Sequence, residues 1–159
     1  MPAENLSTGW HGNLNLIYAK RAGTTLLIHN QNQAPLKVQR PFYPEGPAVC
    51  HSIILHTAGG IVGGDHLSSD FRLQPDAHAL ITTAAAGKIY RSNGNLARQN
   101  IQIHVETGAC LEWLPQESII FNGAIYQQNL KVELAPKASW LGWEITRFGR
   151  TARGEQFLQ

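Results

Sequence analysis

Five side chains that could bind a metal ion or take part in acid–base chemistry fall in two stretches of this sequence. Cys50, His51, His56 and Asp65 lie within sixteen positions, and Glu117 follows in the string WLPQE. A thiol, two imidazoles and two carboxylates suit zinc, copper or nickel better than magnesium or calcium. Because successive side chains of a strand point to opposite faces, Cys50 and His51 cannot hold one ion without a β-bulge. A buried thiol with hydrogen-bonded histidines is the first interpretation, and a weak, transient metal route is the second.

A glycine-rich loop with the sequence AGGIVGGD begins two residues after His56 and ends at Asp65. Its two glycine pairs tolerate positive φ or the close approach of another segment, and the Ile and Val between them are apolar anchors. We therefore predict an ordered loop that carries a site. It is not a Walker loop, because the Gly-Lys pair of this chain precedes an isoleucine in place of Ser or Thr. It also lacks the G-x-G-x-x-G fingerprint of dinucleotide-binding folds.

Glu117 comes directly after a predicted strand end, where Pro115 stops the hydrogen-bond ladder. If it is buried, its carboxylate needs a cation such as Lys88 or Arg91, because the ionised form loses its hydration. A salt-bridged structural acid is the first interpretation, and a catalytic acid is the second. No Ser-His-Asp or Cys-His arrangement marks an activated nucleophile, so the sequence favours a protein that is not an enzyme.

The elements that position these residues are short strands joined by turns. Alternating and β-branched residues predict a hairpin of strands at 13–18 and 24–29, and a second turn covers 30–34. A short strand at 36–39 is followed by a stretch with three prolines, and a further strand at 49–56 leads into the glycine loop. The string TTAAAG at 82–87 is too short for a stable helix and is predicted to be a turn.

An internal repeat determines the predicted architecture. The strings FRLQPDAHALITT at 71–83, IHVETGACLEWLP at 103–115 and VELAPKASWLGWE at 132–144 each combine a strand, three turn-like residues and an alanine that opens the next strand. Each unit looks like a β-hairpin too small to bury its own face, so stacking the units builds a core. We predict an all-β fold of stacked β-hairpins, a distorted β-helix or solenoid-like layered architecture with few or no helices. Three unrelated hairpins in an ordinary sandwich are the alternative.

Composition limits the class of protein. A chain of 159 residues with 43% hydrophobic residues can form a single domain, 1–159, with its own core. Its formal net charge of +2 is too small for a nucleic-acid-binding face. No segment resembles a signal peptide or a membrane span, so we expect a soluble cytoplasmic protein. Cys50 and Cys110 are too few for a disulfide framework and are expected to be reduced.

Five strings, in order, resemble the UreD urease accessory protein family, also called UreH. They are QRPFYPEG at 39–46, CH with LHxxGGIVGGD within 50–65, KxYRSxG at 88–94, LEWLPQE at 111–117 and GRxARGExF at 149–157. The resemblance implies a predominantly β fold like a distorted helix of stacked strands. It also implies a non-enzymatic scaffold in nitrogen metabolism, which joins UreF-like and UreG-like proteins on the urease apoprotein so that nickel can be inserted.

The same resemblance implies that nickel crosses an internal polar passage and that no cofactor is tightly bound. Asp65 occupies the acidic position of the glycine motif associated with that passage. Cys50, His51, His56 and Glu117 also match family positions and are further candidates for transient nickel binding.

The sequence departs from the family in two respects. Thr57 and Ala58 replace the usual pair of prolines before the first glycines, and family proteins continue well beyond Gln159. We therefore expect a C-terminally incomplete domain with an open, poorly soluble sheet edge. A β-fold metal-dependent hydrolase using Asp65, His56 and Glu117 is one alternative, and an inactive truncated remnant is another.

Overall fold

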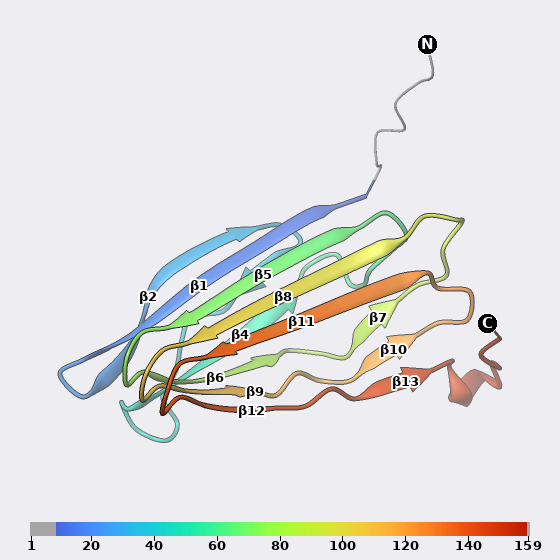
Figure 1. The fold of residues 1–159 in the computed structure, drawn as a ribbon. Helices are drawn as coiled ribbons and strands as arrows, with labels where there is room; N and C mark the ends of the chain where they lie inside the picture. Colours follow the sequence, from blue (N-terminus) through green and yellow to red (C-terminus); the bar gives the residue numbers. More distant parts are fainter. Residues whose placement is uncertain (1–8, 159) are drawn as a thin grey trace, which may run out of the picture.

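The computed structural model describes residues 9–158, which wind around a common core as three β-sheets (Figure 1). Sheet A has the order β11-β8-β5-β1-β2, sheet B the order β12-β9-β6-β4-β3, and sheet C the order β13-β10-β7. The strands are β1 (His11–Arg21), β2 (Thr24–Gln33), β3 (Leu36–Val38), β4 (Val49–His56), β5 (His66–Leu73), β6 (His78–Thr83), β7 (Gly87–Ile89), β8 (Ala97–Val105), β9 (Cys110–Trp113), β10 (Ser118–Ile120), β11 (Tyr126–Leu134), β12 (Ser139–Gly142) and β13 (Thr146–Phe148). Within the described part of the chain the one helical segment is a 3-10 turn, η1 (Thr151–Arg153).

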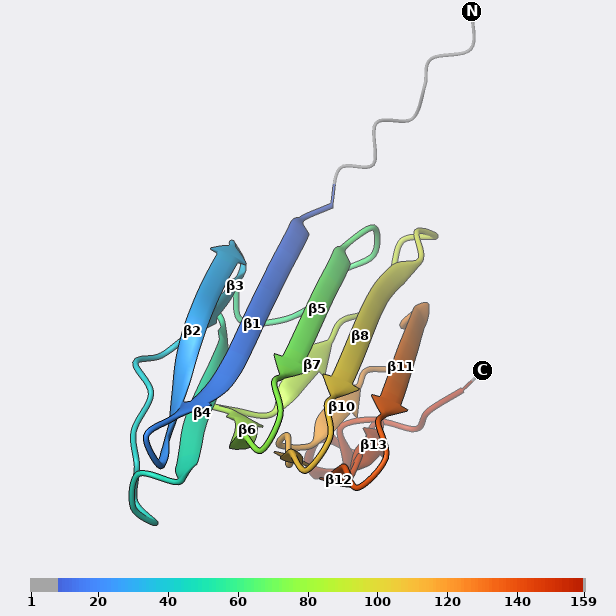
Figure 2. The ribbon, with the colours of Figure 1, turned by 60° about the vertical axis from the view of Figure 1, so that its left-hand side comes forward.

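From β5 onward the chain visits sheets A, B and C in turn, three times. We call these passages coil 1 (β5 to β7), coil 2 (β8 to β10) and coil 3 (β11 to β13). Each strand pairs in parallel with its counterpart in the next coil. Figure 2 shows β1, β5, β8 and β11 side by side with sheets B and C behind them. The mainly β, solenoid-like architecture predicted from the repeat is confirmed.

The register of this stack follows the sequence repeat. Leu73 pairs with Val105, and Val105 pairs with Leu134, so equivalent repeat positions lie directly beside one another. Inward-facing side chains form similar columns, as with Leu16, Phe71 and Ile103, which have no exposed surface. The alternative of unrelated hairpins in a sandwich is therefore wrong.

The repeat units differ from the prediction in one respect, because they are corners between sheets and not hairpins. The N–H of Ala77 donates to the carbonyl of Gln74 over 3.1 Å, and the two later corners repeat this bond at 3.0 Å. Asp76, Gly108 and Lys137 occupy the third position of these corners with positive φ. The turn sends the chain onto the next face, where its hydrogen-bond partners belong to the neighbouring coil.

The N-terminal region closes one end of the stack with antiparallel strands. The predicted hairpin is present as β1 and β2, but the turn predicted at 30–34 is wrong, because β2 continues to Gln33 opposite Asn13. Pairing with the long β1 outweighs the turn-forming preference of these asparagines and glutamines. Strand β4 covers the predicted range, β3 pairs with it, and residues 84–86 connect β6 to β7 without a helix.

The opposite end of the stack is coil 3, whose strands are edge strands of all three sheets. Apolar side chains there are exposed, with Leu134 at 50%, Leu141 at 57% and Phe148 at 58%. The open edge expected from the sequence is therefore present at this end of the described chain. Poor solubility remains a prediction. Residues 9–158 form no helix with the length and apolar character to cross a membrane.

Candidate functional site

Asp65 is fully buried at the end of the glycine loop, where backbone N–H groups donate hydrogen bonds to its carboxylate. The N–H of Trp10 donates to Oδ1 and the N–H of Val62 donates to Oδ2, both over 2.9 Å. Each oxygen therefore has a donor from the main chain. The structure gives Asp65 the role of fastening the loop to the segment that precedes β1, and Asp65 is not among the residues that line the cavity described below.

The glycine loop forms the first step of a column of side chains along one corner of the solenoid. A Cβ on Gly60 would lie 2.3 Å from Cε2 of Tyr90, so only glycine lets the ring pack there. The ring of Tyr90 meets that of Phe121 edge-on at 5.0 Å, and the guanidinium of Arg150 lies 4.4 Å from the centre of the Phe121 ring. We call Gly60, Tyr90, Phe121 and Arg150 the corner ladder. It stacks three of the five strings noted in the sequence.

The last member of the ladder is held by the C-terminal segment. The guanidinium of Arg150 donates to Glu155 through Nη2 over 2.7 Å, and its main-chain N–H donates to the same carboxylate over 2.9 Å. These bonds lower the pKa of Glu155 to about 2. The string GRxARGExF therefore closes the ladder after coil 3.

A cavity of about 640 Å³, partly open to solvent, lies between the three sheets. Apolar side chains such as Ile54, Ile89 and Ile101 form much of its wall, and polar groups from all three sheets and from the loop after β12 interrupt it. Among the five residues predicted from the sequence, His56 lines this cavity. It lies at the end of β4, before the glycine loop.

The imidazole of His56 forms no hydrogen bond within residues 9–158. Both Nδ1 and Nε2 are buried, and neither has a hydrogen-bond partner among the described residues. Burial lowers the pKa of His56, and the negative charge of Asp65 opposes this effect only in part. An imidazole that stays neutral near pH 7 keeps a lone pair available for a metal ion or a proton.

A row of polar side chains crosses the inner face of sheet A and was not predicted. The hydroxyl of Tyr126 lies 2.6 Å from Oε1 of Gln99 and 2.8 Å from Oε1 of Gln128. The side-chain amide of Gln128 in turn donates to Glu144 in coil 3. Burial raises the pKa of Tyr126, and the charge of Glu144 raises it further. These four residues line the cavity with His56, and we call them the polar row.

The position of two glutamines in the sequence repeat indicates the polar row, although neither glutamine belongs to one of the five strings. Gln99 pairs in register with Leu67 and Gln128 pairs with Gln99, at a position where the strands of sheet A point into the core. Counting inward positions along the repeat would have identified glutamines where coil 1 has leucine.

The family described as "UreD urease accessory protein" matches residues 11–159, which is nearly the whole chain. The chain belongs to the UreD family. Proteins named "Urease accessory protein UreD" are 74% identical over 154 residues in Nostoc punctiforme, 69% over 156 in a Nostoc species and 48% over 155 in a Synechocystis species. These alignments cover 97%, 98% and 98% of this chain but 55%, 56% and 57% of the relatives. The chain thus spans a little over half the length of these UreD proteins.

Cys50 and His51 of this UreD chain point to opposite faces of β4, as predicted. Cys50 is fully buried, its thiol is free, and burial raises its pKa. His51 faces outward, with Nε2 at 2.6 Å from Oε2 of Glu45. Neither side chain lines the cavity.

Glu117 is half-buried and forms no salt bridge within residues 9–158, so the pairing with Lys88 or Arg91 considered for a buried acid is absent there. Its main-chain carbonyl accepts a bond of 2.8 Å from the N–H of Gly87, which joins coil 2 to coil 1. Its neighbours Gln116 and Ser118 line the cavity, but Glu117 does not.

The five predicted residues are therefore not gathered into one site in this UreD chain. In the part of the chain that the structure describes, no three His, Cys, Asp or Glu side chains converge on a point that could hold a metal ion. The three residues assigned to a metal-dependent hydrolase, Asp65, His56 and Glu117, do not assemble as a three-ligand centre. The cavity offers one imidazole, amide, phenol and hydroxyl oxygens, and one carboxylate, all of which are weak ligands when they act singly, and Lys88 adds a cation to the same lining.

Proposed function

We propose that this chain acts in urease maturation as a non-enzymatic scaffold in the cytoplasm. In this role it holds UreF-like and UreG-like proteins on the urease apoprotein while nickel is inserted. The observation that carries the proposal is the match to the UreD urease accessory protein family over residues 11–159. Because the chain spans a little over half of its curated relatives, the proposal concerns the part of the scaffold that these residues form.

Nickel is the cargo of this scaffold and moves through the cavity. His56 lies on β4 and Glu144 lies in coil 3, and both line the same cavity. The strands β4, β6, β9 and β12 are consecutive in sheet B, so three strand spacings, about 14 Å, separate these two positions along the stack. Between them lie the neutral oxygens of the polar row.

The ligands of the cavity suit passage better than storage. Ni²⁺ accepts imidazole nitrogen and oxygen ligands, and a closed set of three or four such groups would hold it tightly. A conduit has to release its ion, and single weak ligands spread along the cavity allow release. Asp65, which is bound by two amides, supports the wall of this route and is not a nickel ligand in the proposal.

The test is urease activation in a host that lacks its own UreD. The chain is co-expressed with the urease subunits and the UreF-like and UreG-like proteins, and urease activity and nickel per active site are measured. We expect activation above the level without the chain, and lower nickel loading with His56→Ala or Glu144→Gln. His29→Ala, an exposed histidine on β2, is the matched control and should not change loading. Activation no greater than without the chain would refute the scaffold function, and unchanged loading in both cavity variants would refute the nickel route alone.

A further inference from the structure

We propose that one end of the solenoid is a docking surface for an acidic protein partner with an apolar centre. The surface, which we call the basic end, consists of Trp10, His11 and the loops at 57–66, 90–98 and 121–127. These segments lead into β1, β5, β8 and β11, whose N-terminal ends lie together on the right of Figure 1. The inference rests on the proposed function in one respect, which is that the partner belongs to the urease-maturation assembly.

The apolar part of the basic end consists of three exposed side chains, which precede β1, β5 and β11 of sheet A. Trp10 is 52% exposed, and Val62 and Ile125 are each 43% exposed. Trp10 and Val62 lie close together because both of their amides bind the carboxylate of Asp65. Exposed aromatic and aliphatic side chains at the centre of a surface are typical anchors of protein interfaces, and tryptophan is prominent among them.

Main-chain hydrogen bonds bring Ile125 to the same end. The N–H of Arg98 donates to the carbonyl of Asp65 over 2.8 Å, and the N–H of Ala97 donates to the carbonyl of Ile125 over 3.0 Å. Successive levels are therefore about 4.8 Å apart, which is the spacing of neighbouring strands. Trp10 and Ile125 are separated by three such spacings, about 14 Å, so neighbouring side chains of one partner surface can contact the three apolar groups.

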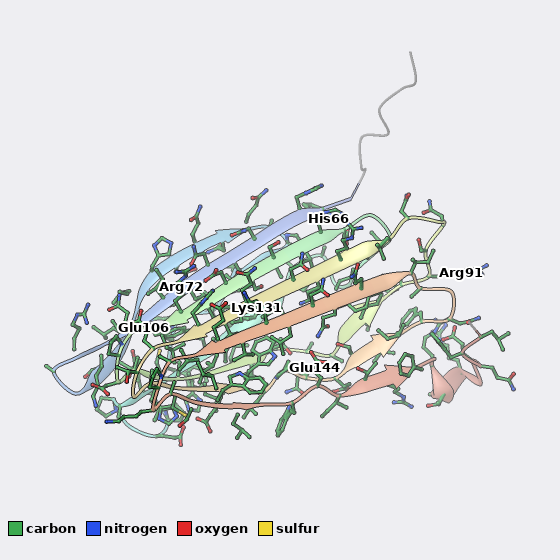
Figure 3. All side chains as sticks on the ribbon, in the orientation of Figure 1. His66, Arg72, Arg91, Glu106, Lys131 and Glu144 are labelled. Atoms are coloured by element: carbon green, nitrogen blue, oxygen red, sulfur yellow. The ribbon has the colours of Figure 1, made fainter. Side chains whose placement is uncertain are left out.

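The charge of the basic end is positive. Arg91 and Arg98 are exposed and form no salt bridge within residues 9–158. Arg98 pairs in register with His66, and Figure 3 places His66 and Arg91 at the same end of the molecule. The three loops contain a single acid, Asp65, which is buried and bound by amides. An acidic partner surface complements this charge, which favours specificity and rapid association.

A nucleic acid is the less suitable occupant of this surface. Its affinity depends on many phosphate contacts, whereas the net charge of the chain is +2 and the basic end presents two unpaired arginines. An apolar centre with tryptophan is also better matched to a protein surface.

The basic end is held rigid before a partner arrives. Asp65 ties Trp10 to Val62, and the N–H of Ser92 donates to the carbonyl of Gly123 over 3.0 Å. A preorganised surface loses less conformational entropy on binding than a flexible one. Asp65 is therefore a positioning residue for docking, which gives its burial a functional consequence.

The test measures binding of the chain to the immobilised urease apoprotein, UreF-like protein and UreG-like protein. The variants are Trp10→Ala, Arg91→Glu and Arg98→Glu, and the matched controls at other places are Leu26→Ala, 39% exposed on β2, and Arg21→Glu, exposed at the end of β1. We expect each variant to weaken binding to at least one of the three proteins by about tenfold or more, and each control to leave it unchanged. Added salt should weaken wild-type binding and affect Arg98→Glu less.

Two outcomes separate the inference from the function on which it rests. Wild-type binding that none of the three variants weakens would overturn the docking surface and leave the scaffold function standing. Absence of wild-type binding to all three proteins would overturn both. Circular dichroism of each variant identifies any that fails to fold, and Arg98→Gln then replaces it, with a smaller loss expected. Tighter binding to a DNA fragment than to any of the proteins would also overturn the inference.

Discussion

Asp65→Ala tests the structural role of the buried carboxylate. The substitution removes both oxygens, which accept bonds of 2.9 Å from the amides of Trp10 and Val62. Leaving a buried donor without a partner costs about 1 to 3 kcal/mol. The segment at Trp10 is half open to water, which can satisfy its amide in part, so we expect a total loss of about 3 kcal/mol in the free energy of unfolding. For a chain of this size that loss lowers the melting temperature by about 6 to 12 °C.

Asp65→Asn provides the graded comparison. Its side chain keeps one acceptor oxygen but places an NH₂ group against the second amide, so about half of the loss is expected. The surface control is Asp70→Ala, which breaks the pair between Asp70 and Arg72 at 2.9 Å. That exposed pair is worth at most about 1 kcal/mol.

Thermal unfolding by circular dichroism and amide hydrogen exchange together measure this prediction. We expect the Trp10 and Val62 amides to lose protection in Asp65→Ala by more than global destabilisation accounts for. A melting temperature equal to that of Asp70→Ala, with unchanged exchange at both amides, would refute the reasoning. Asp65 would then be free to act as a ligand.

Two further predictions concern the corner ladder and the cavity. Gly60→Ala should displace the ring of Tyr90, because the added Cβ would lie 2.3 Å from it. Denaturant titration should show a loss of about 1 to 3 kcal/mol in the free energy of unfolding. Gly87→Ala is the control and should be nearly neutral, because the atom nearest to its added Cβ would be 3.6 Å away. Equal stability of the two variants would contradict this packing. Burial lowers the pKa of His56 below its ordinary 6.5 in the folded protein. Below pH 6.5 the unfolded chain therefore binds more protons at this residue than the folded chain does. The contribution of His56 to the free energy of unfolding is complete above pH 6.5 and declines as the pH falls towards the lowered pKa. His56→Gln should reduce this slope of the denaturation midpoint between pH 5 and 7, and His29→Gln should not; an unchanged slope in His56→Gln would show that the imidazole titrates normally.

The stacking of the fold could be predicted from the repeat, but the direction of the chain at each corner could not. A turn with positive φ at its third residue, such as the one at Asp76, fits both a hairpin and a corner between sheets. The outcome depends on whether Leu73 pairs with the following strand or with Val105 in the next coil. That choice is made by distant parts of the chain, and local sequence does not encode it.

The candidate site was predicted in part. The glycine motif identified Asp65 and His56, but the residue types alone could not indicate that amides bind one side chain and leave the nitrogens of the other free. Gln99 and Gln128 belong to no motif, because their significance depends on facing inward in the same column of the stack. A reading that assigns each repeat position to the inside or the outside would have found them.

Within residues 9–158, coil 3 has a neighbour on one side only, and so does the layer of β2 and β3 at the other end of the stack. In a stack where each layer contacts only the adjacent layers, the free energy of a layer is the sum of its own term and one or two interface terms, as in a linear chain of coupled units. The layer built around β11 lacks one of these interface terms. The layer of β2 and β3 lacks one as well, so opening of residues 9–158 should begin at these two end layers and spread towards the middle of the stack, and local melting should precede the loss of the remaining levels.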